Sequence, residues 1–301
     1  MTRFAWAKSP TFKRSLHLMG SVIAVASLYF VGRRLYQYRH DIDLDLLTPG
    51  LSVGLLALCG VIAAANVCLA LAWHTLLRHQ LLNVSLRWSV LTYGVSQLAK
   101  YIPGNIAHLA GRQVLAVAAG LPGWQLARVM AVELGVQAIA ATVFAVLIVP
   151  LVWPALPIWV ALLGWMVALG VMGWGAGRFS RALTQALIWN WLFLLVSAGV
   201  FVAILLVLMP ESLTFTLVVA AGSSFIVAWL IGFVTPGAPA GVGVREIILL
   251  TLLGSYLPEQ GLILAVVLAR LVTLGGDIVY FSAAGIAVLQ QRLQQRKDAS
   301  K

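Results

Sequence analysis

The stretch Ala228–Glu246, AWLIGFVTPGAPAGVGVRE, decides the fold of this chain. A long apolar run is interrupted there by Pro236-Gly237, and the chain then passes through Arg245 and Glu246 into a second apolar run. Inside hydrocarbon, such a break leaves backbone N–H and C=O groups unpaired, so it persists only where it is packed in protein or lines a polar cavity. The stretch therefore predicts a broken helix at a functional site within a membrane.

Composition places the rest of the chain in a bilayer as well. Of the 301 residues, 61% are apolar and only 10% are charged, which is too little polar surface to cover a soluble protein. The formal net charge is +11, but the lysines and arginines gather at the ends of apolar segments, where basic residues set membrane orientation. The pattern predicts an all-α polytopic membrane protein and argues against nucleic acid as a partner.

We predict about six full transmembrane helices within a single transmembrane domain, residues 1–301. The spans are expected at about 16–32, 51–77, 126–149, 157–176, 182–209 and 261–289. Each apolar run is long enough, since a helix needs roughly 17 to 25 such residues to cross the hydrocarbon. For the first run the alternative is a cleaved signal peptide, but hydrophobicity continues past the candidate processing site Ala24-Val25-Ala26.

Two further apolar stretches, 88–119 and 213–256, are each split by a proline–glycine break. The arms of the first stretch have about 15 residues, fewer than the roughly 20 of a full span, so we predict a broken or re-entrant hairpin that enters and leaves on one side. The second stretch is predicted as another broken hairpin, although its first arm is long enough to span outright. The residues predicted to form the breaks are Pro103, Gly104, Pro236, Gly237, Gly241 and Gly243.

Basic residues define the expected orientation. With a cytoplasmic amino terminus and hairpins that do not change sides, the cytoplasmic side holds the carboxy-terminal tail and Arg78, Arg87, Arg128, Arg178 and Arg181. The opposite side holds Arg33, Arg34 and Arg39, which three aspartates offset. This asymmetry follows the positive-inside rule. It predicts a multi-pass protein of a bacterial-type plasma membrane with both termini in the cytoplasm.

The two breaks also indicate an internal repeat. Arg112 follows Pro103 by nine residues, and Arg245 follows Pro236 by the same nine. The two predicted units are about 51–149 and 182–289. In the expected topology the hairpin of the first unit opens to the cytoplasm and the hairpin of the second opens to the other side. Two units in opposite orientations are the plan of an alternating-access transporter, whose substrate site lies near the midplane.

These stretches carry a resemblance to a known family. Lys100–Gly104, KYIPG, with Arg112, and PGAPAGVGVRE ending at Arg245-Glu246, resemble the two signature stretches of the flippase-like transmembrane domain of lysylphosphatidylglycerol synthases. The resemblance covers roughly residues 16–289. Ala240 departs from the motif, because the family usually has a second consecutive glycine there. The resemblance implies a free-standing lipid flippase without the aminoacyl-transferase domain, acting on a phospholipid or a polyprenyl-phosphate-linked lipid.

Ionisable residues inside the membrane region mark the expected site. We predict a substrate site formed by Lys100, Asn105, Arg112, Glu133, Arg245, Glu246, Arg270 and Asp277. Each charge costs at least about 2.5 kcal/mol at mid-bilayer on insertion scales, so these residues are expected to face a wet or protein-lined interior and to pair with one another. Arg112 and Arg245 are the predicted phosphate ligands, because a guanidinium grips two phosphate oxygens at once. For the carboxylates Glu133, Glu246 and Asp277 we consider three roles. They form salt bridges that alternate between states, they recognise a cationic headgroup, or they couple transport to protons.

Structural interpretations of the same residues remain open. Lys100 is also placed to extend its ammonium to the cytoplasmic surface. Arg112 with Glu133, or Arg245 with Glu246, are candidates for ion pairs that hold the hairpins in place, and an internal ion pair is weak support for a function.

Three classes of function follow, of which a flippase for an anionic, phosphate-containing lipid is favoured. The second is an intramembrane lipid-phosphate transferase with Glu133 or Asp277 as base, although the sequence shows no nucleophile and base pair, metal cluster or nucleotide-binding loop. The third is a scaffold subunit for an enzyme that modifies a lipid or a polyprenyl-phosphate sugar. We expect no cofactor and no metal site. A homo-oligomer or a partner lipid-modifying enzyme is the expected protein assembly.

Overall fold

The computed structural model describes residues 49–101, 107–235 and 238–299 of the chain. These ranges contain helices, turns and connecting segments, with no β-strand among them. Within them, six helices are long and apolar enough to cross a membrane. The all-α, multi-pass membrane class predicted from composition is therefore confirmed.

Five predicted spans coincide with these helices. They are α2 (Pro49–His79), the continuous run of α5 (Gly123–Thr142), η4 (Val143–Ile148) and α6 (Val149–Val152), α7 (Ile158–Phe179), α8 (Arg181–Leu208) and α11 (Glu259–Ala299). The predicted span at 16–32 lies outside the described residues. The sixth crossing helix is α9 (Phe215–Val234), which was expected as the first arm of the second hairpin and is long enough to span by itself. A short 3-10 helix, η5 (Pro210–Ser212), precedes it.

The remaining helices are short. α3 (Leu86–Ser96) continues into the 3-10 helix η3 (Gln97–Tyr101), and α4 (Ala107–Ala118) follows. The 3-10 helix η6 (Pro239–Gly241) precedes α10 (Val244–Leu253). Helices of 11, 12 and 10 residues, as in α3, α4 and α10, rise only about 15 to 18 Å, against roughly 30 Å of hydrocarbon. None of the three has the length of a full span.

Residues with positive φ build the turn before α10. Ala240, Gly241 and Gly243 have φ angles of 49°, 69° and 84°, in the left-handed region that glycine adopts readily and other residues rarely do. A Cβ added to Gly241 would lie 2.9 Å from the Cα of Gly232 on α9. The turn and α9 therefore approach backbone to backbone, which requires glycine at both positions.

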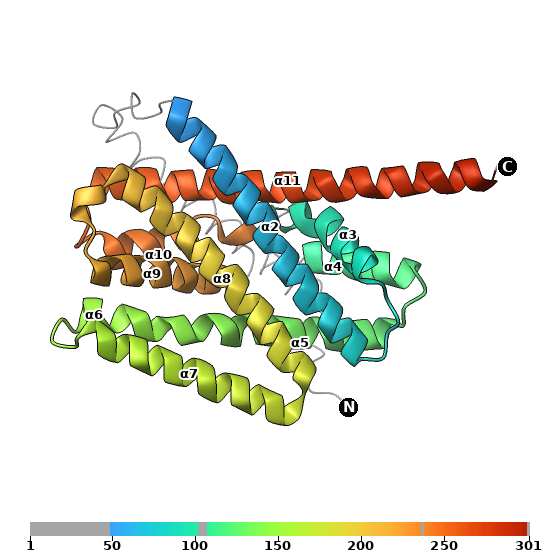
Figure 1. Cartoon of the computed structure of the whole chain (residues 1–301), viewed down its shortest axis with the longest axis horizontal. Helices are drawn as coiled ribbons and strands as arrows, with labels where there is room; N and C mark the ends of the chain where they lie inside the picture. Colours follow the sequence, from blue (N-terminus) through green and yellow to red (C-terminus); the bar gives the residue numbers. More distant parts are fainter. Residues whose placement is uncertain (1–48, 102–106, 236–237, 300–301) are drawn as a thin grey trace, which may run out of the picture.

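The longest helix, α11, packs against α2, α3, α8 and α10. Figure 1 shows α2 crossing it and one end of α8 beside its amino-terminal part, and shows its carboxy-terminal part extending well beyond the other helices. Its 41 residues give a length of about 60 Å at 1.5 Å per residue, roughly twice the thickness of the hydrocarbon. Part of α11 therefore continues outside the membrane core.

Two consecutive glycines bring α11 against α2. A Cβ added to Gly275 would lie 2.6 Å from the Sγ of Cys59, and one added to Gly276 would lie 2.5 Å from the Cγ2 of Ile62. Small residues allow membrane helices to approach this closely. The contact places the next residue, Asp277, fully inside the bundle.

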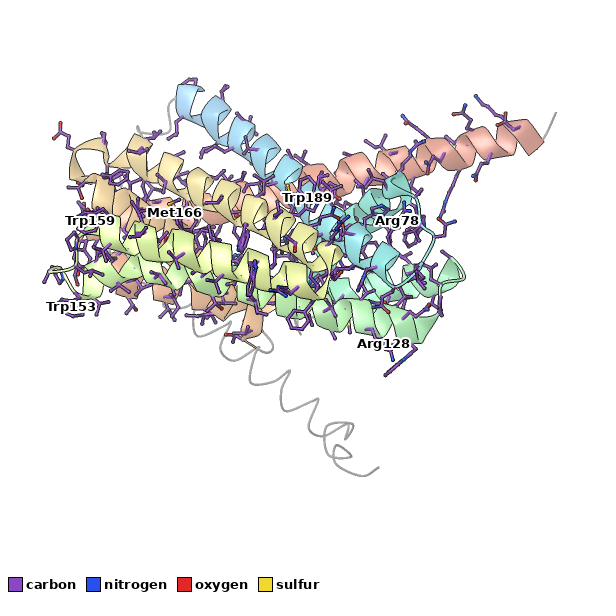
Figure 2. The ribbon with its side chains drawn as sticks, turned by 60° about the horizontal axis from the view of Figure 1, so that its bottom comes forward. Arg78, Arg128, Trp153, Trp159, Met166 and Trp189 are labelled. Carbon is purple, nitrogen blue, oxygen red and sulfur yellow. The ribbon has the colours of Figure 1, made fainter. Side chains whose placement is uncertain are left out.

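The outermost span is α7, in which Ala161 is the one buried residue. Several of its large apolar side chains, including Trp159 and Met166, are exposed, as is expected of a helix face in contact with lipid. Figure 2 shows Trp159 toward one end of the molecule and Arg78 and Arg128 toward the other. The two arginines predicted on the same side of the membrane thus lie at the same end.

Candidate functional site

A cavity of about 80 Å³ lies beside η3 and η6. The 3-10 helices η3 and η6, which adjoin the breaks, contact each other, and the cavity is also lined by residues of α2, α3, α4, α5, α8, α9, α10 and α11. A buried water needs roughly 10 to 15 Å³ of such space and a few polar partners. The cavity therefore has room for several waters or for a small polar group.

Half of the predicted site residues line this cavity, namely Lys100, Arg245, Arg270 and Asp277. Glu246 adjoins it through an ion pair with Arg270, and Arg112 and Glu133 form a separate pair. Asn105 and the break residues Pro103, Gly104, Pro236 and Gly237 lie outside the described residues. Gly241 and Gly243 form the turn before α10.

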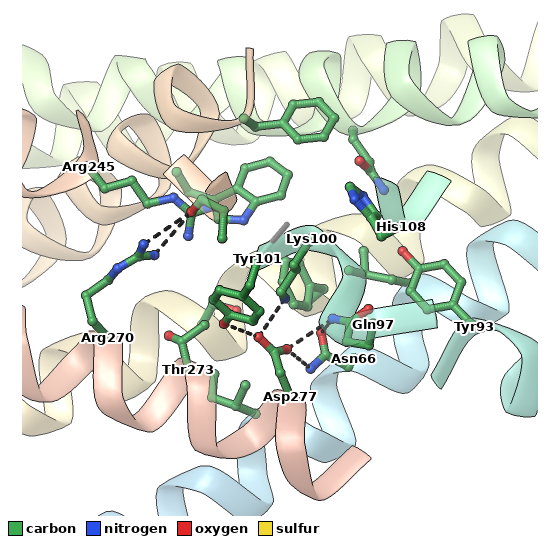
Figure 3. A pocket seen from close by; sticks show the side chains of 18 of the residues that line it. Asn66, Tyr93, Gln97, Lys100, Tyr101, His108, Arg245, Arg270, Thr273 and Asp277 are labelled. Carbon is green, nitrogen blue, oxygen red and sulfur yellow. Dashed lines mark hydrogen bonds and ion pairs between the residues drawn. The ribbon is translucent and has the colours of Figure 1, made fainter. Parts of the chain in front are cut away.

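Asp277 is the centre of a network that joins α11 to η3 and α2 (Figure 3). One carboxylate oxygen, Oδ2, lies 2.7 Å from the Nζ of Lys100 and accepts a 2.6 Å hydrogen bond from the hydroxyl of Tyr101. The other, Oδ1, accepts bonds of 3.0 Å from the side-chain amides of Asn66 and Gln97. Four donors around one carboxylate compensate the cost of burying its charge. Lys100 is therefore engaged with Asp277 in this structure.

Arg270 makes the equivalent connection to the other break. Its Nε lies 2.7 Å from the Oε1 of Glu246 on α10. Its two terminal nitrogens each donate a 3.3 Å hydrogen bond to the carbonyl oxygen of Ala240 in η6. Arg270 and Asp277 are two helical turns apart on one face of α11. One face of a single helix therefore binds η3 as well as η6 and α10.

Arg245 differs from the other charged residues around the cavity. Among the described residues, no carboxylate forms an ion pair with it, and its Nε is buried without a hydrogen-bond partner. A Cβ on Gly232 or Gly241 would lie 2.8 Å from its Cγ or 2.7 Å from its Nε. The two glycines thus leave the space through which the side chain of Arg245 reaches the cavity. Its guanidinium carbon lies 5.9 Å from the ring centre of Trp229.

Among the described residues, the charges around the cavity do not balance. Lys100, Arg245 and Arg270 supply three positive charges, while Asp277 and Glu246 supply two negative charges. One positive charge is left without a counter-charge, which is costly in the membrane interior. The cavity can therefore bind an anion, and Arg245, whose Nε has no hydrogen-bond partner within the described ranges, is the group placed to hold it.

Arg112 lies in a different environment from Arg245. Its Nη2 is 2.7 Å from the Oε2 of Glu133, and each of the two side chains is only 1% exposed. Its guanidinium carbon lies 4.9 Å from the ring centre of Trp73 and 4.4 Å from that of Tyr93. Arg112 is not among the residues that line the cavity. The structure therefore does not bring Arg112 and Arg245 together, and the pair of Arg112 with Glu133 is the ion pair considered from the sequence.

Several cavity residues were not predicted as site residues. Asn66 and Gln97 are polar residues within apolar segments, and this signal was available in the sequence. The aromatic residues Phe193, Trp229 and Phe233 gave no such signal, because aromatic residues in an apolar helix usually belong to the core. Trp229 stacks on Phe233, with ring centres 5.1 Å apart, and meets Phe193 edge-on at 6.1 Å.

No family model matches this chain, and no curated protein matches it. What the cavity binds is therefore inferred from its own residues.

Proposed function

We propose that this protein is a membrane lipid flippase, which moves a lipid with an anionic, phosphate-containing headgroup between leaflets by alternating access. Arg245 carries the proposal. It lines an interior cavity and has no carboxylate partner among the described residues. A guanidinium binds phosphate through two parallel hydrogen bonds. The phosphate supplies the missing negative charge, while the acyl chains of the lipid stay in the bilayer.

The proposed architecture is an inverted repeat of two broken hairpins, α3–η3–α4 and α9–η6–α10. Support comes from their placement in Figure 1, where α3 and α4 lie toward one end of α11 and α9 and α10 toward the other. Further support comes from the contact between η3 and η6 beside the cavity. In alternating-access transporters, broken helices meet at a substrate site near the midplane. The resemblance to the flippase-like domain of lysylphosphatidylglycerol synthases favours the same class.

In this proposal the two ion pairs of α11 act as latches. The pair of Lys100 with Asp277 holds η3, and the pair of Arg270 with Glu246 holds the turn before α10. A lipid phosphate beside Arg245 competes with each carboxylate for its cation. Binding therefore weakens the latches, and opening toward one leaflet releases one latch while the other remains closed. The carboxylates act as alternating salt bridges in this cycle.

Reconstitution in liposomes tests the proposal. Purified protein is incorporated with lipids that carry a fluorescent acyl chain, and a membrane-impermeant quencher reports how fast the label moves between leaflets. We expect movement with the native protein and at least about a tenfold slower rate with Arg245→Gln, because a charged hydrogen bond pair to phosphate is lost.

The matched control is Arg128→Gln, which removes an arginine that does not line the cavity. This variant is expected to move lipid at the native rate. Equal rates for Arg245→Gln and the native protein would contradict the role of Arg245. Chemical conversion of the lipid would indicate a transferase, and absence of both movement and conversion would indicate a scaffold.

A further inference from the structure

The carboxylates near the cavity are all committed to protein cations within the described part of the chain. Asp277 is 0% exposed and is bound to Lys100 and three hydrogen-bond donors. Glu246 is paired with Arg270 through Oε1, and its Oε2 is buried without a hydrogen-bond partner, but Glu246 does not line the cavity. Glu133 is enclosed with Arg112. A headgroup in the cavity therefore meets no available carboxylate.

Breaking a latch does not create a site for a cation. When Asp277 separates from Lys100, the lysine is released into the same site, and the same holds for Glu246 and Arg270. Counted over the described residues, the excess of one positive charge from Arg245 stays in every such rearrangement. An ammonium group on a headgroup would consequently meet a net positive cavity throughout.

The aromatic residues of the cavity do not form a cage for a cation either. Cationic ligands bind over open faces of aromatic rings. One neighbour of Trp229 is the guanidinium of Arg245, 5.9 Å from its ring centre, and another is the ring of Phe233, stacked at an interplanar angle of 6°. The protein's own cation thus takes the place that an ammonium ligand would need.

Away from the arginines, the cavity offers uncharged hydrogen-bonding groups. Figure 3 shows His108 and Tyr93 on the opposite side of the cavity from Arg245 and Arg270. The Nδ1 of His108 is buried and has no hydrogen-bond partner. Gln137, Ser197 and Thr273 also line the cavity, as do Asn66 and Gln97, whose side-chain amides donate to Asp277. Such groups pair with hydroxyls, and unpaired buried polar groups are costly.

We infer that the headgroup beyond its phosphate is uncharged and bears hydroxyl groups, and that the cavity rejects lipids with an ammonium group. The inference rests on the proposed function and specifies its substrate class. Arg245 holds the phosphate at one side of the cavity, and the neutral polar residues hold the hydroxyls at the other. This assignment excludes recognition of a cationic headgroup, one of the three roles considered for the carboxylates.

Three lipids with headgroups of similar size distinguish the effect of headgroup charge on binding from the effect of headgroup hydroxyls. Phosphatidylglycerol carries one negative charge and two hydroxyls, phosphatidylethanol carries the same charge without hydroxyls, and phosphatidylethanolamine adds an ammonium. Binding of short-chain forms to the full chain in detergent is measured by native mass spectrometry, with lysyl-phosphatidylglycerol as a fourth probe. Inorganic phosphate, added as a competitor, separates a lipid site from a site for a free anion.

Phosphatidylglycerol is expected to bind at least about tenfold tighter than either ammonium lipid, because like charges repel strongly in a poorly solvated site. It is expected to bind about threefold or more tighter than phosphatidylethanol, the effect of one neutral hydrogen bond. Equal or tighter binding of an ammonium lipid would overturn the charge selection. Equal binding of phosphatidylethanol would overturn the role of the hydroxyls, and displacement by millimolar inorganic phosphate would overturn a lipid headgroup as the ligand.

A designed carboxylate provides a second test. Gln137→Glu adds a negative charge to the cavity at nearly constant side-chain volume, and Gln137→Leu removes the amide without adding charge. We expect the first variant to reduce the preference for phosphatidylglycerol over phosphatidylethanolamine by at least about tenfold, and the second to reduce it by only about threefold, the effect of one neutral hydrogen bond. Ser197→Asp makes the same test from α8 if Gln137→Glu does not fold. An unchanged preference in the folded acidic variant would contradict the inference.

Binding and movement distinguish this inference from the function on which it rests. Selective binding of phosphatidylglycerol without its movement between leaflets would support the inferred headgroup class and contradict the proposed flippase function. If phosphatidylglycerol and phosphatidylethanolamine bind with equal affinity and move between leaflets at equal rates, the flippase function is supported and the inferred headgroup class is contradicted.

Discussion

At the scale of single residues, two arginines at equivalent positions of the sequence have different roles. Arg112 is paired with Glu133 and lies against two aromatic rings, so its charge is compensated inside the protein. Arg245 lines a cavity and has no carboxylate partner within the described ranges. The partner available to each guanidinium, rather than its place in the motif, determines whether it is free to bind a ligand.

The buried pair of Arg112 and Glu133 gives a prediction about stability. Removing one partner leaves the other charge buried and alone, which costs about 3 to 5 kcal/mol. We expect Arg112→Met and Glu133→Leu each to destabilise the protein by about this amount, and the double variant to be clearly more stable than either single variant. Unfolding in detergent, followed for all three, provides the measurement. Additive losses in the double variant would show that the pair is not coupled.

Ala240, whose backbone conformation favours glycine, gives a second prediction. Ala240 has a φ of 49°, in a region that costs an L-residue roughly 1 to 2 kcal/mol and costs glycine almost nothing. Because glycine is also more flexible in the unfolded chain, Ala240→Gly is expected to stabilise the protein by only about 0.5 to 1 kcal/mol. Thermal unfolding of the purified variant measures this effect.

Gly241→Ala is the matched comparison, one residue away. Here φ is 69°, and the added Cβ would lie 2.7 Å from the Nε of Arg245. We expect this variant to be destabilised by at least about 1 kcal/mol. The same sign for both variants would show that backbone conformation does not control this turn.

At the scale of elements, α11 connects the two halves of the site. Its residue Asp277 binds η3, and its residue Arg270 binds η6 and α10. The glycine contact with α2 holds the helix in place between them. A movement of α11 relative to either break must therefore change an ion pair.

This arrangement predicts that η3 and the turn before α10 can each lose its ion pair with α11 independently of the other. Asp277→Asn removes the ion pair with Lys100 and is expected to raise amide hydrogen exchange in η3 by about tenfold or more, the effect of roughly 1.4 kcal/mol of lost local stability. Exchange in the turn before α10 should stay at the native rate. Arg270→Gln should give the reverse pattern. Mass spectrometry of peptides from the two regions measures both, and a rise in both regions with either variant would contradict separate latches.

The elements were largely predictable, and the pairings between them were not. Hydropathy located α2, α7, α8 and α11, because a span needs only a long apolar run. It did not identify the partner of Glu246, for which the sequence suggested the adjacent Arg245. Neighbours on a helix point in different directions, so Glu246 instead meets Arg270 from another helix. Contacts of this kind depend on tertiary packing, which a single sequence does not contain.

For the site as well, the local sequence predicted which residues lie inside the protein but not which residues they contact. Charges in apolar segments identified Arg245, Arg270 and Asp277 as interior residues, because a charge in hydrocarbon requires a protein-lined environment. That Arg112 would be enclosed by Trp73 and Glu133, away from the cavity, depends on how α2, α4 and α5 pack. Nothing in the local sequence separates it from Arg245.

At the scale of the whole molecule, the basic residues predict one orientation. The carboxy-terminal part of α11 extends beyond the other helices, and Arg78 and Arg128 lie toward the same end of the molecule. The positive-inside rule places such an end in the cytoplasm. A fluorescent protein fused after residue 301 is therefore expected to fluoresce, and alkaline phosphatase fused there is expected to be inactive. The opposite pair of results would reverse the orientation.

The length of α11 has a consequence for how this protein is observed at work. About 33 Å of continuous helix separate Asp277 from the last described turn, at 1.5 Å per residue. If α11 tilts as a rigid rod about the site, a rotation of about 10° sweeps its tip through about 6 Å over that length. A spin label near the tip, paired with one on α8, is expected to register each cycle as a change in distance. The position of the carboxy-terminal end of α11, outside the bilayer, thus reports conformational changes at the site within it.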